Sequence, residues 1–257
     1  MNNHHIKIAS YGRWSSRKTL QIASLIEKFG SDSVIVVNAD KGIGPVASVA
    51  TNILDANSLD DLRRAYGEAT KWLKERPDAW LCLDGMTRVM NWVADEALGG
   101  ADEYAEALAL GTPHAGIETR LKPYRRFITD SGGIDTMRIY GMIGTDSKNL
   151  LGAWLRLPCN LYGTYLEDMT SNGREKIPPY VPDVPGQVGL KAVMSTFDFV
   201  IRLTIKKGVC VAQMDPESSL YLSRTREDQV VSGALPKEIE NFNLAEFVQR
   251  IRGSNKV

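Results

Sequence analysis

The sequence predicts a single α/β domain in which helices flank a mainly parallel β-sheet, with an antiparallel β flank near the C-terminus. Strand-like and helix-like segments alternate through the first 100 residues, an order that favours parallel strands joined by helices. Residues 33–38 and 80–84 are almost entirely apolar, as in strands buried on both faces of a parallel sheet. Short alternating segments after residue 197 predict the antiparallel flank.

Spacing and capping residues define the elements of the first half. Residues 18–29 carry apolar side chains at helical spacing, and Ser58 is a good N-cap for a helix that stops before Pro77. Gly99 and Gly100 mark the expected end of the next helix. We expect strands at residues 6–11, 33–38 and 80–84, and helices at residues 18–29, 59–73 and 87–98.

The second half is less regular. The pattern weakens between residues 99 and 133, and residues 170–190 predict a long loop rich in proline and glycine. We find no internal repeat, so residues 1–257 are expected to form one domain, which ends in a helix and tail at 237–257. We expect further strands at residues 160–166, 197–204, 209–212 and 220–223, and helices at residues 147–155 and 244–251.

Composition and charge exclude several classes of protein. A hydrophobic content of 43% and a charged content of 24% are ordinary globular values. Lys plus Arg and Asp plus Glu are both 31, so contact with nucleic acid requires a local basic patch. Cys82, Cys159 and Cys210 lie apart in apolar surroundings and are expected to be buried free thiols. No apolar run reaches the ~20 residues of a membrane span and the polar start is not a signal peptide, so we expect a soluble cytoplasmic protein without a membrane partner.

Residues 12–19, between the first strand and the first helix, have the spacing of a phosphate-binding loop. A P-loop reads Gly-x-x-x-x-Gly-Lys-Ser/Thr, because its backbone amides surround phosphate at a helix N-terminus while the lysine reaches the outer phosphates and the hydroxyl binds Mg²⁺. The segment here fits except at Arg17. The residues expected to bind nucleotide are Gly12, Ser15, Ser16, Arg17, Lys18 and Thr19. The alternative is an ordinary turn in which Ser15 and Ser16 cap the helix.

Arg17 replaces the second glycine of the P-loop pattern. Glycine permits a positive φ and a close approach of the backbone to phosphate, which a Cβ obstructs. Three outcomes stay open: the loop relaxes and binds nucleotide weakly, the guanidinium itself contacts phosphate, or binding is lost. Reduced hydrolysis is the mildest expectation.

Two aspartates follow strands of the predicted sheet. Asp84 ends an apolar strand, the place of an aspartate that holds Mg²⁺ through water; capping of the next helix is the alternative. Asp40 follows the strand at residues 33–38, where a carboxylate could orient an attacking water; a solvated turn is the alternative. We therefore expect Lys18 and Asp40 to be catalytic, and Thr19 and Asp84 to hold the metal.

These motifs resemble those of RecA-like P-loop ATPases, and in particular the compact ones that tailed phages encode near their recombination genes. The loop is similar to the family's Gly-Pro-Glu-Ser-Ser-Gly-Lys-Thr, Asp40 lies where the family has its catalytic glutamate, and residues 83–87 look like its second aspartate motif. The similarity continues through a proline-rich loop that ends at Pro185-Gly186 and a late basic stretch at Arg224. It covers the chain from Ile6 to about Pro236.

The resemblance implies a protein that binds ATP and Mg²⁺, assembles into rings or filaments, and acts on single-stranded DNA in the cytoplasm of an infected host cell. It implies that Arg224 and Arg226 approach a neighbouring subunit's phosphates, although exposed strand-end charges are the alternative. It also implies that Glu167 is a phosphate sensor at the end of the fourth strand. Arg17 and Asp40 depart from the family's glycine and glutamate, which predicts weak hydrolysis.

A basic and aromatic cluster is the candidate DNA-binding segment. Binding of single strands needs cations along the backbone and aromatic platforms for the bases. The expected contacts are Arg120, Lys122, Tyr124, Arg125 and Arg126, with Phe127 as a further platform. The alternative is a helix face whose long side chains cover apolar surface.

The sequence thus predicts an ATP-binding RecA-like protein of phage recombination or replication. The alternative function is a non-catalytic assembly or virion structural protein that keeps the P-loop fold, in which Arg17 is a relic of lost activity. Retention of nucleotide and Mg²⁺ by the purified protein distinguishes the two.

Overall fold

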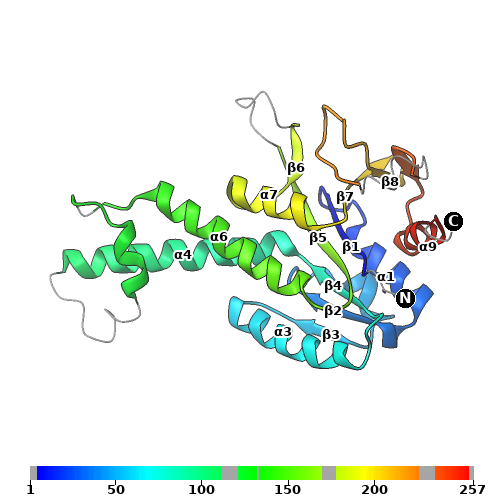
Figure 1. The fold of residues 1–257 in the computed structure, drawn as a ribbon, viewed down its shortest axis with the longest axis horizontal. Coiled ribbons are helices and arrows are strands. Elements are labelled where there is room, and N and C mark those ends of the chain that lie inside the picture. The colour runs from blue at the N-terminus through cyan, green and yellow to red at the C-terminus, as the bar shows by residue number, and fades with distance from the viewer. Residues whose placement is uncertain (1–4, 111–120, 132, 170–177, 226–234, 255–257) are drawn as a thin grey trace.

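A computed structural model describes residues 5–110, 121–131, 133–169, 178–225 and 235–254, which build one mixed β-sheet flanked by helices (Figure 1). The sheet order is β3-β2-β4-β5-β1-β7-β8-β9. The parallel strands are β1 (Lys7–Gly12), β2 (Val34–Asn38), β3 (Ile53–Asp55), β4 (Trp80–Asp84), β5 (Asn160–Met169) and β7 (Phe199–Lys206). The antiparallel strands are β6 (Tyr180–Pro182), which pairs with β5, and β8 (Val209–Gln213) and β9 (Glu238–Glu240), which close one edge. The predicted parallel sheet with an antiparallel C-terminal flank is confirmed.

Helices cover both faces of the sheet because its strands are apolar on both sides. Val34 and Val36 of β2 belong to one core cluster, whereas Ile35 and Val37 belong to the other, so alternate residues point to opposite faces. On the first face lie α1 (Lys18–Phe29), α2 (Gly44–Ala47) and α9 (Leu244–Ser254). On the second face lie α3 (Leu59–Lys74), α4 (Met86–Ala109), α6 (Thr136–Leu155) and α7 (Gly186–Thr196).

The best-predicted helices begin where the sequence places them. The hydroxyl of Ser58 accepts a hydrogen bond from the backbone N–H of Asp61, at 3.2 Å, and so caps α3 as expected. Helix α1 begins at Lys18 and ends at Phe29, the expected bounds. The short 3₁₀ helix η1 (Ser31–Ser33) then leads into β2.

Helix α4 is longer than expected and carries a part of the molecule that projects from the sheet (Figure 1). The prediction that it ends at Gly99 and Gly100 is wrong. A Cβ on Gly100 would lie 2.3 Å from the ring of Tyr124, so this glycine makes room for the ring and does not end the helix.

Helix α6 packs beside α4, and the 3₁₀ helix η2 (Lys122–Phe127) lies against both. Helix α6 begins at Thr136 and not at residue 147, because Asp135 caps it by accepting from the backbone N–H of Arg138. We call the distal part of α4 (residues 97–109), η2 and the first part of α6 (residues 136–143) the projecting lobe. Its own small core is formed by Ala97, Ala101, Phe127, Ile139 and Ile143.

The proline-rich region differs most from its prediction. Residues 170–177 lie outside the described part of the chain, but the remainder of the expected loop holds β6 and the start of α7. Residues 220–223 do not form a strand: Tyr221 makes a single isolated bridge to Tyr180. The strand at the edge of the sheet is instead β9.

The expected state of the cysteines is confirmed, since Cys82, Cys159 and Cys210 are buried free thiols. Burial raises the pKa of the Cys159 thiol to about 11. Among the described helices, none combines the length and the apolar character that crossing a membrane requires.

Candidate nucleotide-binding site

The carboxyl ends of the parallel strands bring most of the predicted site residues to one edge of the sheet. Strand β1 leads into residues 12–19, β2 into Asp40, β4 ends in Asp84, and β5 carries Glu167. In open α/β sheets, ligands bind in the crevice outside these strand ends. The topology therefore assembles one candidate site from segments that are far apart in the sequence.

The loop at residues 12–19 enters α1 without a side-chain cap. Arg17 is the N-cap, with φ 67° and ψ 24°, and its side chain makes no capping hydrogen bond. Ser15 also has a positive φ of 62°. The alternative in which Ser15 and Ser16 cap the helix is wrong, because no backbone amide of α1 bonds to either hydroxyl within the described residues. The first N–H groups of a 12-residue helix thus stay available, which is the arrangement that binds anions.

The positive φ of Arg17 explains why the P-loop pattern has glycine at this place. A left-handed conformation costs a residue with a Cβ roughly 1–2 kcal/mol. The guanidinium donates from Nη2 to the carbonyl of Gly208, at 3.0 Å, in the turn between β7 and β8. Arg17 is therefore directed toward that turn, which separates its side chain from the other cations of the loop.

The side chain of Lys18 folds back over the loop at residues 12–19. Its Nζ donates to the carbonyl oxygens of Gly12 (2.8 Å) and Arg13 (2.9 Å) and to the hydroxyl of Ser16 (3.1 Å). Burial lowers the pKa of Lys18 to about 8, against the opposing attraction of nearby carboxylates. A bound phosphate would supply the negative charge that this half-buried ammonium lacks at close range.

Thr19 and Asp84 meet as the P-loop pattern predicts. The Thr19 hydroxyl lies 3.1 Å from Oδ2 and 3.3 Å from Oδ1 of Asp84, and Thr164 donates to Oδ1 at 2.7 Å. Burial raises the pKa of Asp84, although the hydrogen bonds from Thr164 and Thr19 lower it. Asp84 does not cap α4, whose N-cap is Gly85, so the capping alternative is wrong.

The residues around Thr19 fit Mg²⁺ coordination of the kind seen in P-loop sites. A hydroxyl and a carboxylate are hard oxygen ligands, and Mg²⁺ keeps several waters and takes substrate phosphates for its other ligands. The described residues contain no group of three or more His, Cys, Asp or Glu side chains that could hold a metal by themselves. Thr19 and Asp84 are thus suited to a metal that arrives with a phosphate ligand.

Asp40 and Lys18 line the same cavity. A Cβ on Gly85 would be 2.7 Å from the Cβ of Asp40, so glycine at that position lets the β2 loop approach the end of β4. The cavity has a volume of about 370 Å³ and is lined by Trp14, Lys18, Asp40, Arg88, Asn91 and Thr164, among others. The carboxylate of Asp40 and the ammonium of Lys18 therefore share one cavity beside the loop.

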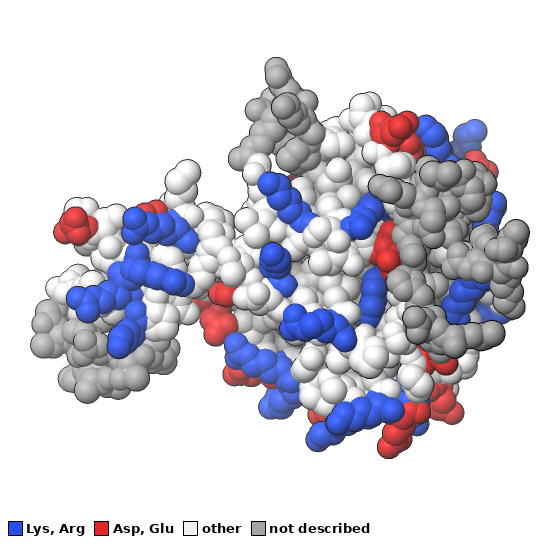
Figure 2. Space-filling view, in the orientation of Figure 1, with Lys and Arg blue, Asp and Glu red and all other residues white. Residues whose placement is uncertain are grey.

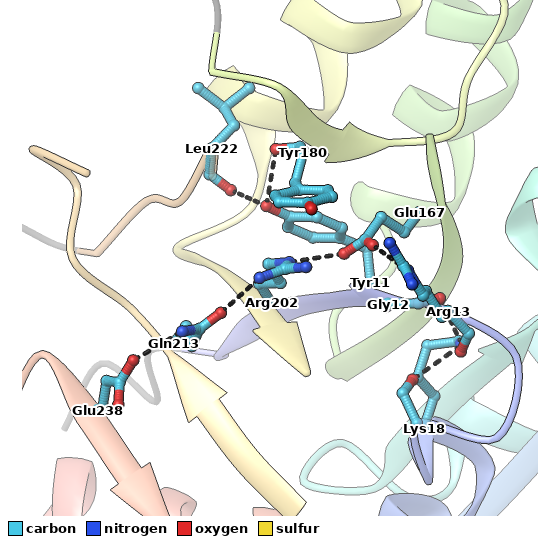
Figure 3. A network of polar contacts seen from close by, with 11 residues as sticks. Tyr11, Gly12, Arg13, Lys18, Glu167, Tyr180, Arg202, Gln213, Leu222 and Glu238 are labelled. Carbon is cyan, nitrogen blue, oxygen red and sulfur yellow. Dashed lines mark hydrogen bonds and ion pairs between the residues drawn. The ribbon is translucent and has the colours of Figure 1, made fainter. Parts of the chain in front are cut away.

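Glu167 is the centre of a charge network at this edge of the sheet (Figure 3). Its side chain is 2% exposed and pairs with Nε of Arg13 at 3.2 Å and with Nε of Arg202 at 2.6 Å. Arg202 also donates to Gln213, and its guanidinium lies 4.0 Å from the centre of the Tyr180 ring. Glu167 thus joins the P-loop to β7, and both of its carboxylate oxygens are already engaged.

The other predicted residues lie away from the phosphate loop or outside the described chain. Arg224 donates from Nη1 to the carbonyl of Met194 near the end of α7, and Arg226 lies outside the described residues. In the candidate DNA segment, Arg120 also lies outside them. Lys122, Arg125 and Arg126 are exposed on η2, and Tyr124 is half-buried. Phe127 is buried in the lobe core, so its predicted role as an exposed platform is wrong.

Five residues of the site were not predicted from the sequence. Thr164 supports Asp84, Arg13 and Arg202 pair with Glu167, and Trp14 and Arg88 line the cavity. Arg13 and Trp14 could have been found, because they lie inside the P-loop pattern. Thr164 and Arg202 lie in strands, and the sequence carries no signal that shows which strands lie next to them in the sheet.

Comparison with known proteins does not assign this site to a family. No protein-family model matches the chain, and no curated protein matches it at a significant level.

Proposed function

We propose that the protein binds ATP with Mg²⁺ at residues 12–19. One observation carries the proposal: Lys18, Thr19 and Asp84 converge at the uncapped N-terminus of α1. Backbone amides and Lys18 would hold the phosphates, while Thr19 directly and Asp84 through water would hold the metal. The bound metal would supply charge neutralisation at the outer phosphates.

Hydrolysis is proposed to be weak. Asp40 lines the cavity beside Lys18 and is the candidate that orients water, but its side chain is one methylene shorter than the glutamate of the RecA-like pattern. Arg17 adds the steric cost of a Cβ in a loop where phosphate binding favours glycine. Both features favour a protein whose activity depends on nucleotide binding more than on nucleotide hydrolysis.

Contact with single-stranded DNA is proposed for the projecting lobe. Figure 2 shows Lys and Arg side chains gathered over this part of the molecule. Lys122, Arg125 and Arg126 of η2 are exposed there, and Arg138 of α6 lies close enough to donate to the carbonyl of Arg126. With Phe127 buried, the aromatic contribution falls to Tyr124 at the base of the cluster.

Assembly into a ring or filament belongs to the same proposal, as the resemblance to RecA-like phage ATPases implies. One subunit offers few cations to a nucleic-acid backbone, and only repeated subunits would align them along a strand. The second candidate is the non-catalytic assembly or virion protein. It is favoured by one observation, the strained Arg17 in the loop.

Fluorescence anisotropy with a labelled single-stranded oligonucleotide tests the DNA proposal. We expect binding by the wild type that strengthens with a non-hydrolysable ATP analogue and weakens with salt, by about 0.7 log units per phosphate neutralised for each tenfold rise in salt concentration. Arg125→Glu combined with Arg126→Glu should weaken binding to all sequences alike and leave nucleotide affinity unchanged.

The matched control reverses two exposed cations in the last turn of α3. Lys71→Glu with Lys74→Glu changes the net charge by the same amount, and both side chains are exposed. Equal losses of oligonucleotide affinity in the two double variants would show that the effect depends on net charge alone. No binding by the wild type with or without the analogue, at low salt, would favour the assembly protein.

A further inference from the structure

Arg88 lines the same cavity as Lys18 and Asp40, although no motif of the sequence marks it. It is the third residue of α4, whose N-terminus follows Asp84 directly through Gly85. Its side chain is exposed and makes no hydrogen bond or ion pair with the described residues. Arg88 thus brings five donors to the lining of the cavity, and none of the described residues accepts from them.

The neighbouring polar side chains already make hydrogen bonds within the protein. Thr87 donates to the carbonyl of Asp183 at 2.8 Å and accepts from the backbone N–H of Leu166 at 2.9 Å. Thr164 donates to Asp84 and accepts from the backbone N–H of Gly85. Arg88 differs from both threonines, because no described residue takes up its side-chain donors, which can serve a ligand in the cavity.

Charge balance also favours a role for Arg88. Among the residues that line the cavity, the charges of Lys18 and Asp40 offset each other. Arg88 gives this lining a net positive charge, which favours an anionic ligand. Arg88 and Asp40 face the same cavity without pairing with each other, so a ligand can lie between them.

We infer that Arg88 is a ligand of the outermost phosphate of a bound nucleoside triphosphate, supplied from the same chain. The inference rests on the proposed nucleotide site. Guanidinium groups suit this task, because their planar fork of donors matches phosphate oxygens and they stay charged at any physiological pH. Lys18 and the α1 amides contact the phosphates from the P-loop, and Arg88 would contact the last phosphate from the α4 side.

As a ligand of the outermost phosphate, Arg88 would make the protein bind nucleoside triphosphates more tightly than diphosphates, independently of any effect on turnover. We expect Arg88→Ala to weaken binding of a non-hydrolysable ATP analogue with Mg²⁺ roughly 10- to 100-fold, the loss that follows removal of one charge-assisted hydrogen bond. Affinity for ADP should change less than about twofold. Arg88→Lys should recover part of the affinity, since it restores the charge without the fork.

Isothermal titration calorimetry of both nucleotides with the wild type, Arg88→Ala, Arg88→Lys and Arg156→Ala gives the answer. Arg156 is the matched control, an exposed arginine that directly follows α6. Equal losses for ADP and the ATP analogue, or no loss for either, would overturn the outer-phosphate assignment while leaving the nucleotide site intact. A wild type that binds neither nucleotide would overturn the proposed function and this inference with it.

Discussion

Charged residues are arranged differently at the phosphate-loop edge of the sheet and on the projecting lobe. At the edge, Glu167 is 2% exposed and is held by two arginines, and Asp84 is buried with hydrogen bonds from two threonines. On the lobe, Arg125 and Arg126 are exposed above a small core. Loss of a charged residue at the edge is therefore expected to cost stability, whereas the lobe is expected to tolerate changes of its surface charge.

Removal of Glu167 should produce the largest loss of stability in this comparison. Glu167→Ala leaves Arg202, whose side chain is 13% exposed, as a buried cation without its partner. Breaking a buried pair in this way costs about 3–5 kcal/mol. Urea unfolding followed by circular dichroism measures the change in the free energy of unfolding.

The matched control lies on the lobe. Arg138 pairs with Asp135 through an ion pair in which the arginine side chain is 69% exposed, and Arg138→Ala should cost no more than about 1 kcal/mol. Comparable losses for the two variants would remove the distinction between edge and lobe.

A smaller effect on stability is expected at Arg17, which is strained and lies in the proposed nucleotide-binding loop. Arg17→Gly should stabilise the protein by about 1 kcal/mol, because glycine accepts the positive φ without the steric cost of a Cβ. It should also strengthen nucleotide binding or raise turnover. Arg17→Ala is the control, since it removes the bond to Gly208 but keeps the strain.

Thermal unfolding and nucleotide titration of both variants separate the two contributions. A loss of nucleotide binding in Arg17→Gly would identify the guanidinium as a working ligand and refute the view that it is a relic.

Much of the edge could be predicted because its signals are local. Lys18 and Thr19 follow a strand within one motif, and Asp84 ends a continuous apolar run. Parallel strands then bring their carboxyl ends together, so the meeting of Thr19 with Asp84 follows from order alone. The partners of Glu167 did not follow, because Arg202 reaches it from a strand 35 residues later in the chain.

The lobe and the proline-rich region show where local signals mislead. Gly100 reads as a helix end, but it makes room for the Tyr124 ring, a contact that only the tertiary fold creates. Pro185 reads as part of a loop, yet it directly precedes α7, whose buried Ala192 and Val193 pack on the sheet. Phe127 reads as an exposed platform, and burial beneath α4 and α6 makes it a core residue.

The central claim is that residues 12–19 hold nucleotide phosphates, and calorimetry of Lys18→Ala tests it most directly. Lys18 makes its hydrogen bonds within the loop itself, so its removal should leave the cooperative unfolding transition in place. With Mg²⁺ and a non-hydrolysable ATP analogue, we predict binding by the wild type and none by Lys18→Ala. Equal affinity of the two proteins would contradict the account.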